Sequence, residues 1–442
     1  MSVKKWILAF LLIGCLIFTF SPSLGALFNA TSIWDVREQI VFLTGVCAIS
    51  LMVLSVITSA RFAVVNKMAG GLDKAYSIHK WAGIYAFVFS LLHWLTEKSA
   101  GWLIDLNIIA HPGELGDSSQ FSQFEIVLFR TGVLLAEISF YLIVILIILS
   151  LTKKVPYYFF RKIHKAFPVI FLVLAFHAVT AQLKENWLSS PAGYVLLLLI
   201  AVGCGAACWG LFQKIGRSRQ VKSVVKAYDI QQNGMLKIDL QILAPWFNYQ
   251  PGQYVFLTFS HNEEPHPFSI ASFEADSRNL RFVIKEQGDF TRDLKNYIKV
   301  GQYVRIEGPY GEFTFNDRCE RQIWIAGGIG IAPFLAKLEA LARLENNEKT
   351  IDFWYCTSGC PFEHYPVSLP ELCQRARVKL HHIDTIRQAR LTVADIVKEV
   401  SNIEKVSIWF CGSQQFSASL QADLKQHRFD SRYFHYDRFN MR

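Results

Sequence analysis

Residues 77–93 read SIHKWAGIYAFVFSLLH and residues 162–177 read KIHKAFPVIFLVLAFH. Each stretch is apolar and carries a histidine near either end, 14 residues apart in the first and 13 in the second. On a helix such a pair lies about 20 Å apart. Imidazoles are costly in a membrane span and usually serve a function there. The spacing predicts two helices that hold two stacked metal centres, and bis-His ligation of two haems is favoured. The four ligands would be His79, His93, His164 and His177.

The two spacings make different demands on the helices. Fourteen residues bring a side chain nearly back to its starting face, so His79 and His93 are expected to share one. Thirteen residues leave an offset of about 140°, so the second helix must be distorted if its histidines share a face. Pro168 gives a reason for such a kink. With both helices running outward, His79 is expected to pair with His164, and His93 with His177. The alternative is that each histidine is only a polar packing residue.

The flanking sequence is typical of a membrane protein. Hydrophobic residues make up 52% of the 442 residues and dominate the first half. Six runs are long enough to cross about 30 Å of hydrocarbon. They lie at 6–27, 37–59, 75–97, 124–151, 163–182 and 191–213. A cleaved signal peptide is the alternative for the first run, but no clean cleavage site follows it.

The charged residues indicate the orientation of these runs. The net charge is +9, and lysines and arginines cluster at the ends of alternate runs rather than in one patch. This favours membrane orientation over nucleic-acid binding, and the positive-inside rule places both termini in the cytoplasm. We therefore expect an integral membrane protein, in a bacterial inner membrane. The nine cysteines show neither ferredoxin-type nor zinc-type spacing.

The second half of the chain has a different pattern. Short runs that alternate apolar and polar residues, such as 237–242 and 254–259, are bounded by turns at Asn233-Gly234 and Pro251-Gly252. This is typical of a small antiparallel barrel or sandwich. From about 320, strand-like and helical runs alternate, as in a parallel α/β domain. The predicted organisation is an α-helical transmembrane bundle at 1–213, a linker at 214–222, a β-barrel at 223–318 and an α/β domain at 319–442.

Several short motifs follow one another in this half. The glycine-rich run Ala326-Gly327-Gly328-Ile329-Gly330-Ile331-Ala332-Pro333-Phe334 lies between a predicted strand and a predicted helix. Its glycines permit close backbone approach, and the helix N-terminus favours a pyrophosphate, although a plain strand–helix turn is the alternative. The other motifs are His266-Pro267-Phe268-Ser269, Gly288-Asp289-Phe290-Thr291, Gly308-Pro309-Tyr310-Gly311 and Phe410-Cys411-Gly412.

In this order the motifs resemble the flavin and nicotinamide module of the ferredoxin–NADP reductase type. Joined to the apolar runs and the histidine spacing, the chain resembles the ferric reductase / NADPH oxidase superfamily from about residue 37 to 442. The resemblance implies that one segment lies along the FAD ring, with Ser269 near its N5 atom: His266, Pro267, Phe268 and Ser269. The FAD pyrophosphate would be held by Gly288, Asp289 and Thr291. Near the C-terminus, Phe439 would cover the flavin face.

The resemblance also implies a nicotinamide site. The cofactor loop would contain Gly327, Gly328, Gly330 and Pro333. Cys411 would lie beside the nicotinamide, with a buried strand-end thiol as the alternative, so Cys411 and Ser269 are the expected catalytic residues. NADPH is preferred to NADH, although the stretch from Cys356 to Cys360 has no adjacent arginine to pair with a 2′-phosphate.

The implied activity is electron transfer across a membrane. Cytosolic NAD(P)H would reduce FAD, and two b-type haems would pass electrons outward to a small acceptor, either a ferric iron chelate or oxygen. The alternatives are an electron-relay subunit that reduces an external partner protein, and a non-haem scaffold. Oxygen-reducing relatives tend to have a histidine where this chain has Glu97, and a carboxylate is better suited to a cation. Arg37 resembles an arginine beside the outer haem, or is an interfacial anchor, and His111 is most simply a solvated loop residue.

Overall fold

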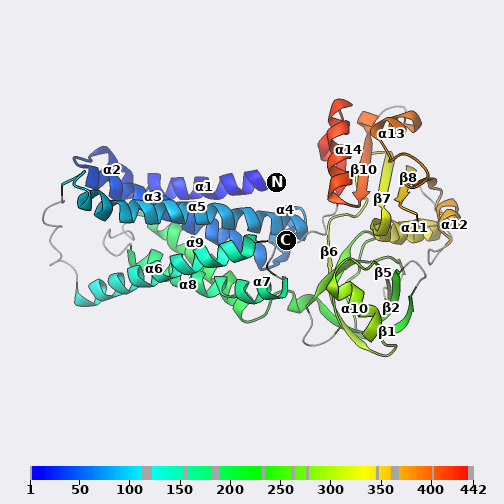
Figure 1. Cartoon of the computed structure of the whole chain (residues 1–442), viewed down its shortest axis with the longest axis horizontal. Coiled ribbons are helices and arrows are strands. Elements are labelled where there is room, and N and C mark those ends of the chain that lie inside the picture. Colours follow the sequence, from blue (N-terminus) through cyan, green and yellow to red (C-terminus); the bar gives the residue numbers. More distant parts are fainter. Residues whose placement is uncertain are drawn as a thin grey trace. The chain divides into compact units, whose positions relative to one another are not determined.

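The computed structural model describes residues 2–110, 122–152, 155, 157–181, 190–230, 234–259, 264–274, 278–344, 348–359, 368–400 and 403–436. The chain divides after Ile215 into two compact units. The first is helical, and the second contains both sheets (Figure 1). Each unit is described by itself.

The first unit is a bundle of helices. In chain order they are α1 Val3–Thr19, α2 Pro22–Phe28, α3 Ile33–Ser59, α4 Ala63–Ala69, α5 Leu72–Asp105, α6 Gln123–Leu151, α7 Tyr157–His164, α8 Phe167–Ala181 and α9 Pro191–Leu211. Capping boxes begin two long helices, with Ser32 and Asp35 at α3 and Ser122 and Glu125 at α6. Helices α1, α3 and α5 lie side by side, and α8 packs against α6 and α9 (Figure 1).

Small residues let these helices approach closely. A Cβ atom at Gly203 of α9 would come within 2.5 Å of the Phe171 ring and 2.8 Å of the Val53 side chain. The glycine therefore allows α9 to contact both α8 and α3, as small residues do in membrane bundles.

Four helical segments are long and apolar enough to cross a membrane: Ile33–Ser59, Gln123–Leu151, Phe159–Ala181 and Pro191–Leu211. Helices α1 and α2, bent by 69°, make a fifth candidate if the pair counts as one span. The run predicted at 75–97 is helical within the 34-residue α5, but it is not among these candidates. Its histidines and charged residues lower its mean hydropathy. The expected six spans are therefore not confirmed among the described residues.

The distortion expected between His164 and His177 is present. Helix α7 ends at His164, a turn covers 165–166, and α8 begins at Phe167. The Ala166 N–H donates to the Ile163 carbonyl at 3.0 Å, so the chain tightens there instead of continuing the α pattern. Pro168 lies in the first turn of α8, where its missing N–H costs nothing.

The second unit begins with a six-stranded antiparallel sheet, in the order β4-β3-β6-β1-β2-β5. The strands are β1 Gln220–Ile230, β2 Leu236–Ile242, β3 Tyr254–Thr258, β4 His266–Ser269, β5 Asn279–Ile284 and β6 Tyr303–Tyr310. The Ala271 N–H donates to the Arg281 carbonyl at 2.8 Å, so the chain after β4 bridges to β5 and nearly closes a barrel. Helix α10, Asp289–Tyr297, buries Leu294 in the barrel core.

One predicted boundary is wrong. Strand β1 begins at Gln220, so the last three residues of the stretch predicted as a linker at 214–222 belong to the strand. The reason is that Val221 is buried in the barrel core, and residues 220–224 pair with β6. The basic composition of this segment concealed the strand, since its lysines project outward.

A five-stranded parallel sheet follows, in the order β11-β10-β7-β8-β9, as the α/β prediction required. Its elements are β7 Arg321–Gly327, the 3-10 turn η5 Gly328–Ile331, α11 Ala332–Leu344, β8 Thr350–Thr357, α12 Leu369–Arg375, β9 Lys379–Asp384, α13 Val393–Glu399, β10 Val406–Cys411, α14 Gln414–Gln426 and β11 Phe434–Tyr436. Helices α11 and α12 cover one face and α13 and α14 the other.

The barrel and the parallel sheet are joined by a half-buried ion pair. Arg281 of β5 donates to Glu339 of α11 at 3.2 Å and to Asp239 of β2 at 3.0 Å. The second oxygen of Glu339 accepts from the Phe273 N–H at 2.8 Å. Because Glu339 lies on α11 and both of its partners belong to the barrel, it ties the two sheets into one unit.

Candidate functional site

The four histidines of the first unit meet in two pairs. The ring centroids of His79 and His164 lie 5.8 Å apart at an interplanar angle of 72°. Those of His93 and His177 lie 6.3 Å apart at 74°. Two imidazoles on opposite sides of one metal, each bonded at about 2 Å, have centroids roughly 6 Å apart. The pairing is the one expected from depth, and its spacing fits a shared metal.

Helix α3 orients the two rings of α5. Nδ1 of His79 lies 2.8 Å from the Ser55 carbonyl, and Nδ1 of His93 lies 2.9 Å from the Val41 carbonyl. A carbonyl can only accept, so Nδ1 carries the proton and Nε2 is left as the ligand atom. A Cβ at Gly45 would lie 3.1 Å from Nδ1 of His93, so the glycine lets this ring sit against α3.

The opposite rings come from α7 and α8. The Nδ1 atoms of His164 and His177 are buried and have no hydrogen-bond partner among the described residues. A Cβ at Gly132 of α6 would overlap Thr180, so α6 packs tightly on the helix turn that holds His177.

The ligand set suits one kind of metal. Within the part of the chain that the structure describes, no three His, Cys, Asp or Glu side chains converge on one point. Two opposed imidazoles alone fit a metal whose remaining ligands are supplied by a macrocycle, as in haem.

An ion pair lies one turn beyond His93. A guanidinium nitrogen of Arg37 is 2.7 Å from the Glu97 carboxylate, and the same guanidinium donates to the carbonyls of Thr96 and Glu97 at 3.1 and 2.8 Å. Arg37 is therefore bonded to the C-terminal part of α5 rather than free. His111 lies outside the described residues.

The segment expected along the flavin ring forms β4. This strand is at the edge of the sheet and pairs only with β3, where Ser269 lies opposite Tyr254. Ser269 is buried, whereas His266, Pro267 and Phe268 are half-buried. The His266 ring stacks on Phe290 of α10, with centroids 3.6 Å apart. The two predicted flavin motifs therefore lie next to each other.

The start of α10 is shaped by Thr291 and Gly288. The Thr291 hydroxyl accepts from the N–H groups of Gln287 and Gly288 at 2.9 and 3.1 Å. Gly288 has an extended backbone, and a Cβ there would meet no atom within 4 Å. Its lack of a side chain keeps this helix N-terminus open, as a bound phosphate needs. The Asp289 side chain is 99% exposed beside Arg292.

The glycine-rich loop and Cys411 also come together. A Cβ at Gly330 would overlap the Cys411 carbonyl, and one at Gly327 would lie 3.4 Å from the Gly412 Cα. Gly328 has a φ of +54°, which favours glycine. Strands β7 and β10 are the neighbours at which the strand order reverses, and such a point is where α/β sheets bind nucleotides. Cys411 is 1% exposed and Pro333 is buried in α11.

Two residues that sequence reasoning missed hold the end of β8. Asp384 accepts from the Gly359 N–H at 2.9 Å and the Ile386 N–H at 3.1 Å, and these bonds lower the pKa of its carboxyl. Arg387 lies 3.7 Å from Asp384 and is 84% exposed. The fold thus brings Arg387 near the stretch that begins at Cys356, which has no adjacent arginine in the sequence. No local pattern signals this contact, because the loops follow different strands. Phe439 lies outside the described residues.

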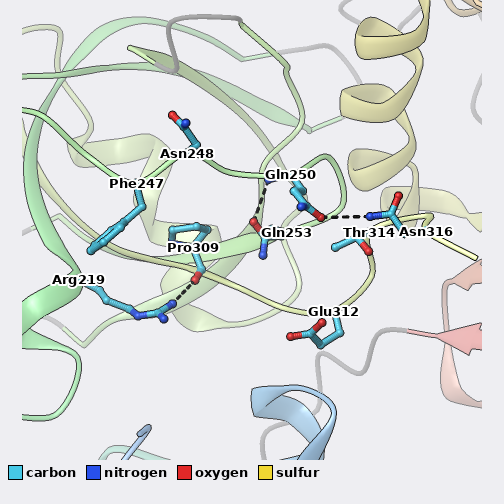
Figure 2. Close-up of a pocket in the computed structure, with 9 residues that line it drawn as sticks. All are labelled: Arg219, Phe247, Asn248, Gln250, Gln253, Pro309, Glu312, Thr314 and Asn316. Carbon is cyan, nitrogen blue, oxygen red and sulfur yellow. Dashed lines mark hydrogen bonds between the residues drawn. The ribbon is translucent and has the colours of Figure 1, made fainter. Parts of the chain in front are cut away.

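A pocket of about 470 Å³ opens on the barrel (Figure 2). Gln253 donates to the Gly311 carbonyl at 3.1 Å beside it, and Arg219 donates to the Pro309 carbonyl at 2.8 Å. None of the predicted flavin or nicotinamide residues lines it. Its lining is Arg219, Phe247, Asn248, Gln250, Gln253, Pro309, Glu312, Thr314 and Asn316.

Comparison with known families divides the chain as the fold does. Residues 44–175 match the ferric reductase like transmembrane component, and residues 220–314 match an FAD-binding domain. The chain thus joins a segment similar to the ferric reductase transmembrane component to a segment similar to an FAD-binding domain. The first match contains His79, His93 and His164, and the second contains the β4 and α10 motifs.

Individual relatives match parts of this chain. The reductase component of propane 2-monooxygenase from Mycolicibacterium smegmatis is 31% identical over 31% of the chain and 40% of its own length. Ferric reductase transmembrane component 6 of Saccharomyces cerevisiae is 24% identical over 70% of the chain and 42% of its own length. The matched part thus spans less than half of each relative. The solved FAD/NAD binding domain of nitric oxide dioxygenase from Vibrio cholerae is 19% identical, with a TM-score of 0.43 over 49% of this chain and 97% of that domain.

Proposed function

We propose that this chain is a membrane oxidoreductase that passes electrons from NADPH to a small acceptor on the far side of the membrane. The observation that carries the proposal is the facing pair of imidazoles, repeated at two levels of the bundle. When bound, FAD takes up two electrons as hydride and releases them singly, and two b-type haems carry them across the apolar layer.

In this proposal the histidines would hold the two haem irons. His79 and His164 would hold the inner one, and His93 and His177 the outer one. The carbonyls of Ser55 and Val41 keep Nε2 of the α5 rings directed toward their partners. The surrounding apolar helices exclude ions and water from the path.

The second unit binds the electron donor in this proposal. Strand β4 supplies the flavin contact through His266, Pro267, Phe268 and Ser269, with Ser269 near the reacting N5 atom. The start of α10 binds the FAD pyrophosphate through Gly288, Asp289 and Thr291. Gly327, Gly328, Gly330 and Pro333 would hold the nicotinamide cofactor, with Cys411 beside the nicotinamide, and Phe439 would cover the flavin.

The outer ion pair favours a ferric chelate over oxygen as the acceptor. A free arginine beside the outer metal would stabilise an anionic product such as superoxide. Here the Glu97 carboxylate neutralises Arg37 at 2.7 Å, and this carboxylate is 53% exposed. The charge that would favour oxygen reduction is thus cancelled.

A reduced-minus-oxidised visible spectrum of the purified full chain tests the haems. We expect b-type bands and two haems per chain. His93→Ala should remove the outer haem alone, whereas the exposed His427→Ala serves as the matched control and should retain both. A spectrum without b-type bands would leave only a non-haem scaffold.

An oxidation assay tests the donor and the acceptor. NADPH and NADH are compared at sub-saturating levels, first with oxygen and then anaerobically with ferric citrate. We expect faster turnover with NADPH and with ferric citrate. A strong NADH preference would overturn the coenzyme assignment. If neither acceptor supports turnover while NADPH still reduces the haems, the chain is instead a relay subunit that reduces an external partner protein.

The orientation is a separate proposal. Lysines and arginines at the ends of alternate apolar runs favour an inner-membrane protein with both termini in the cytoplasm. In bacterial cells, protease added to intact spheroplasts should leave a C-terminal tag uncut, and lysis should expose it.

A further inference from the structure

The outer surface of the barrel carries an unusual strip where β1 and β6 pair. We call it the β1–β6 face and define it as Lys222, Val224, Lys226, Val300 and Tyr303. Val224 and Tyr303 are direct neighbours in the antiparallel register. Tyr303 is 69% exposed and Val300, in the turn before β6, is 64% exposed. Two exposed apolar side chains therefore stand beside lysines.

The lysines of this face are not neutralised by the protein. Lys222 and Lys226 are exposed, and neither has an ion-pair partner among the described residues. Arg305 lies directly opposite Lys222 in the register. Like charges on facing strand positions are unfavourable for the sheet itself. The face is thus cationic and partly apolar, a combination that fits an anionic surface.

We propose that the β1–β6 face docks on the anionic lipid headgroups of the membrane that holds α9. Exposed lysines with an intervening tyrosine and valine match the interfacial region, where cations meet lipid phosphates and amphipathic rings sit at headgroup depth. The proposal depends on membrane anchoring by α9 and not on the electron-transfer activity.

Chain continuity keeps the face near this surface. Helix α9 ends at Leu211 and β1 begins at Gln220. The segment 212–219 between them can span at most about 28 Å when fully extended. It carries Lys214, Arg217 and Arg219, which favour the same headgroups.

Cysteine accessibility in nanodiscs tests the proposal. Val300→Cys is placed in the full chain, which is reconstituted in phosphatidylcholine alone or in a three-to-one mixture with phosphatidylglycerol. The rate of modification by a water-soluble maleimide is followed on the peptide by mass spectrometry. We expect modification about tenfold slower in the anionic discs, with the difference lost in high salt. Ala422→Cys on α14, also exposed, is the control and should react equally in both.

A charge reversal separates lipid from protein as the covering partner. Lys222→Glu with Lys226→Glu should abolish the difference between the two discs, and an unchanged thermal unfolding midpoint shows that the barrel is intact. Equal, fast modification in both discs overturns the proposal. Equal, slow modification in both also overturns it, because the face is then covered by protein. Either result leaves the haem and turnover measurements unaffected, so the proposed function stands or fails separately.

Discussion

The Asp317 carboxylate holds together the N-terminal ends of neighbouring strands in the parallel sheet. This buried carboxylate accepts from Ser407 at 2.7 Å, Gln322 at 2.8 Å, Trp409 at 2.9 Å and Lys349 at 3.0 Å. These donors come from β7, β10 and the turn before β8. Asp317→Ala should therefore destabilise the second unit by about 3 kcal/mol, because several buried donors lose their acceptor. Pulse proteolysis of the full chain in urea measures this, with the exposed Glu371→Ala as a near-neutral control.

The same carboxylate makes stability depend on pH. Burial opposes its ionisation, but hydrogen bonds from Ser407, Lys349 and Trp409 outweigh burial and lower the pKa of Asp317. Because the pKa of this carboxyl in the folded protein lies below its unfolded value of about 4, its ionised form stabilises the fold above that pH. This stabilisation is lost as the pH falls through the folded-state pKa. The second unit should thus lose stability below about pH 4. In Asp317→Asn the urea midpoint should fall less steeply with acidification, and an unchanged slope would contradict this.

Gly45 offers a residue-scale test of the outer histidine pair. A methyl group in Gly45→Ala would press on Nδ1 of His93 at 3.1 Å and shift the ring from the Val41 carbonyl. We expect the redox midpoint of one b-type haem to shift while the other is unchanged. Gly101→Ala on the same helix as His93 is the control, because a Cβ there meets no atom within 4 Å. A shift in both haems would argue against two separate pairs.

At the scale of elements, the break between α7 and α8 sets the position of His164. In a continuous helix its ring would be turned by about 140° from that of His177. Pro168→Ala removes the residue that disfavours a regular helix, so it should lower occupancy of the inner haem more than of the outer one. Haem content per chain, resolved by redox titration, measures the effect. Equal loss at both levels would indicate general misfolding instead.

Sequence patterns were sufficient to predict some elements of the fold and insufficient for others. The runs predicted as strands at 237–242 and 254–259 coincide with β2 and β3 to within one residue, because hydrophobic periodicity reports burial directly. The pairing of the four histidines followed from their expected depths in two helices that run in the same direction. The contact of Asp384 with Gly359 did not, since it joins loops after two different strands, and local patterns carry no information on such partners. The strand at 220–222 was concealed by the outward Lys222 and the basic residues that precede it.

At the scale of the whole second unit, Glu339 couples the barrel to the α/β sheet. It bonds Arg281 of β5 and the Phe273 backbone from its place on α11, and burial raises the pKa of its carboxyl. Glu339→Ala should leave both sheets folded but loosen their junction, by about 2 kcal/mol. Hydrogen exchange should accelerate in β5 and α11 while the center of β10 stays protected. The exposed Glu371→Ala is the control and should change neither.

The dependence of α5 on α3 bears on how the molecule is assembled during synthesis. Helix α5 is the longest helix of the bundle described here but too polar to rank with the apolar spans, so a neighbour must favour its entry into lipid. Helix α3 precedes it from the ribosome and offers the carbonyls that fix both of its imidazoles. The opposing rings emerge only when α7 and α8 are made. Each of the two histidine pairs is therefore completed only after α7 and α8 have been synthesised.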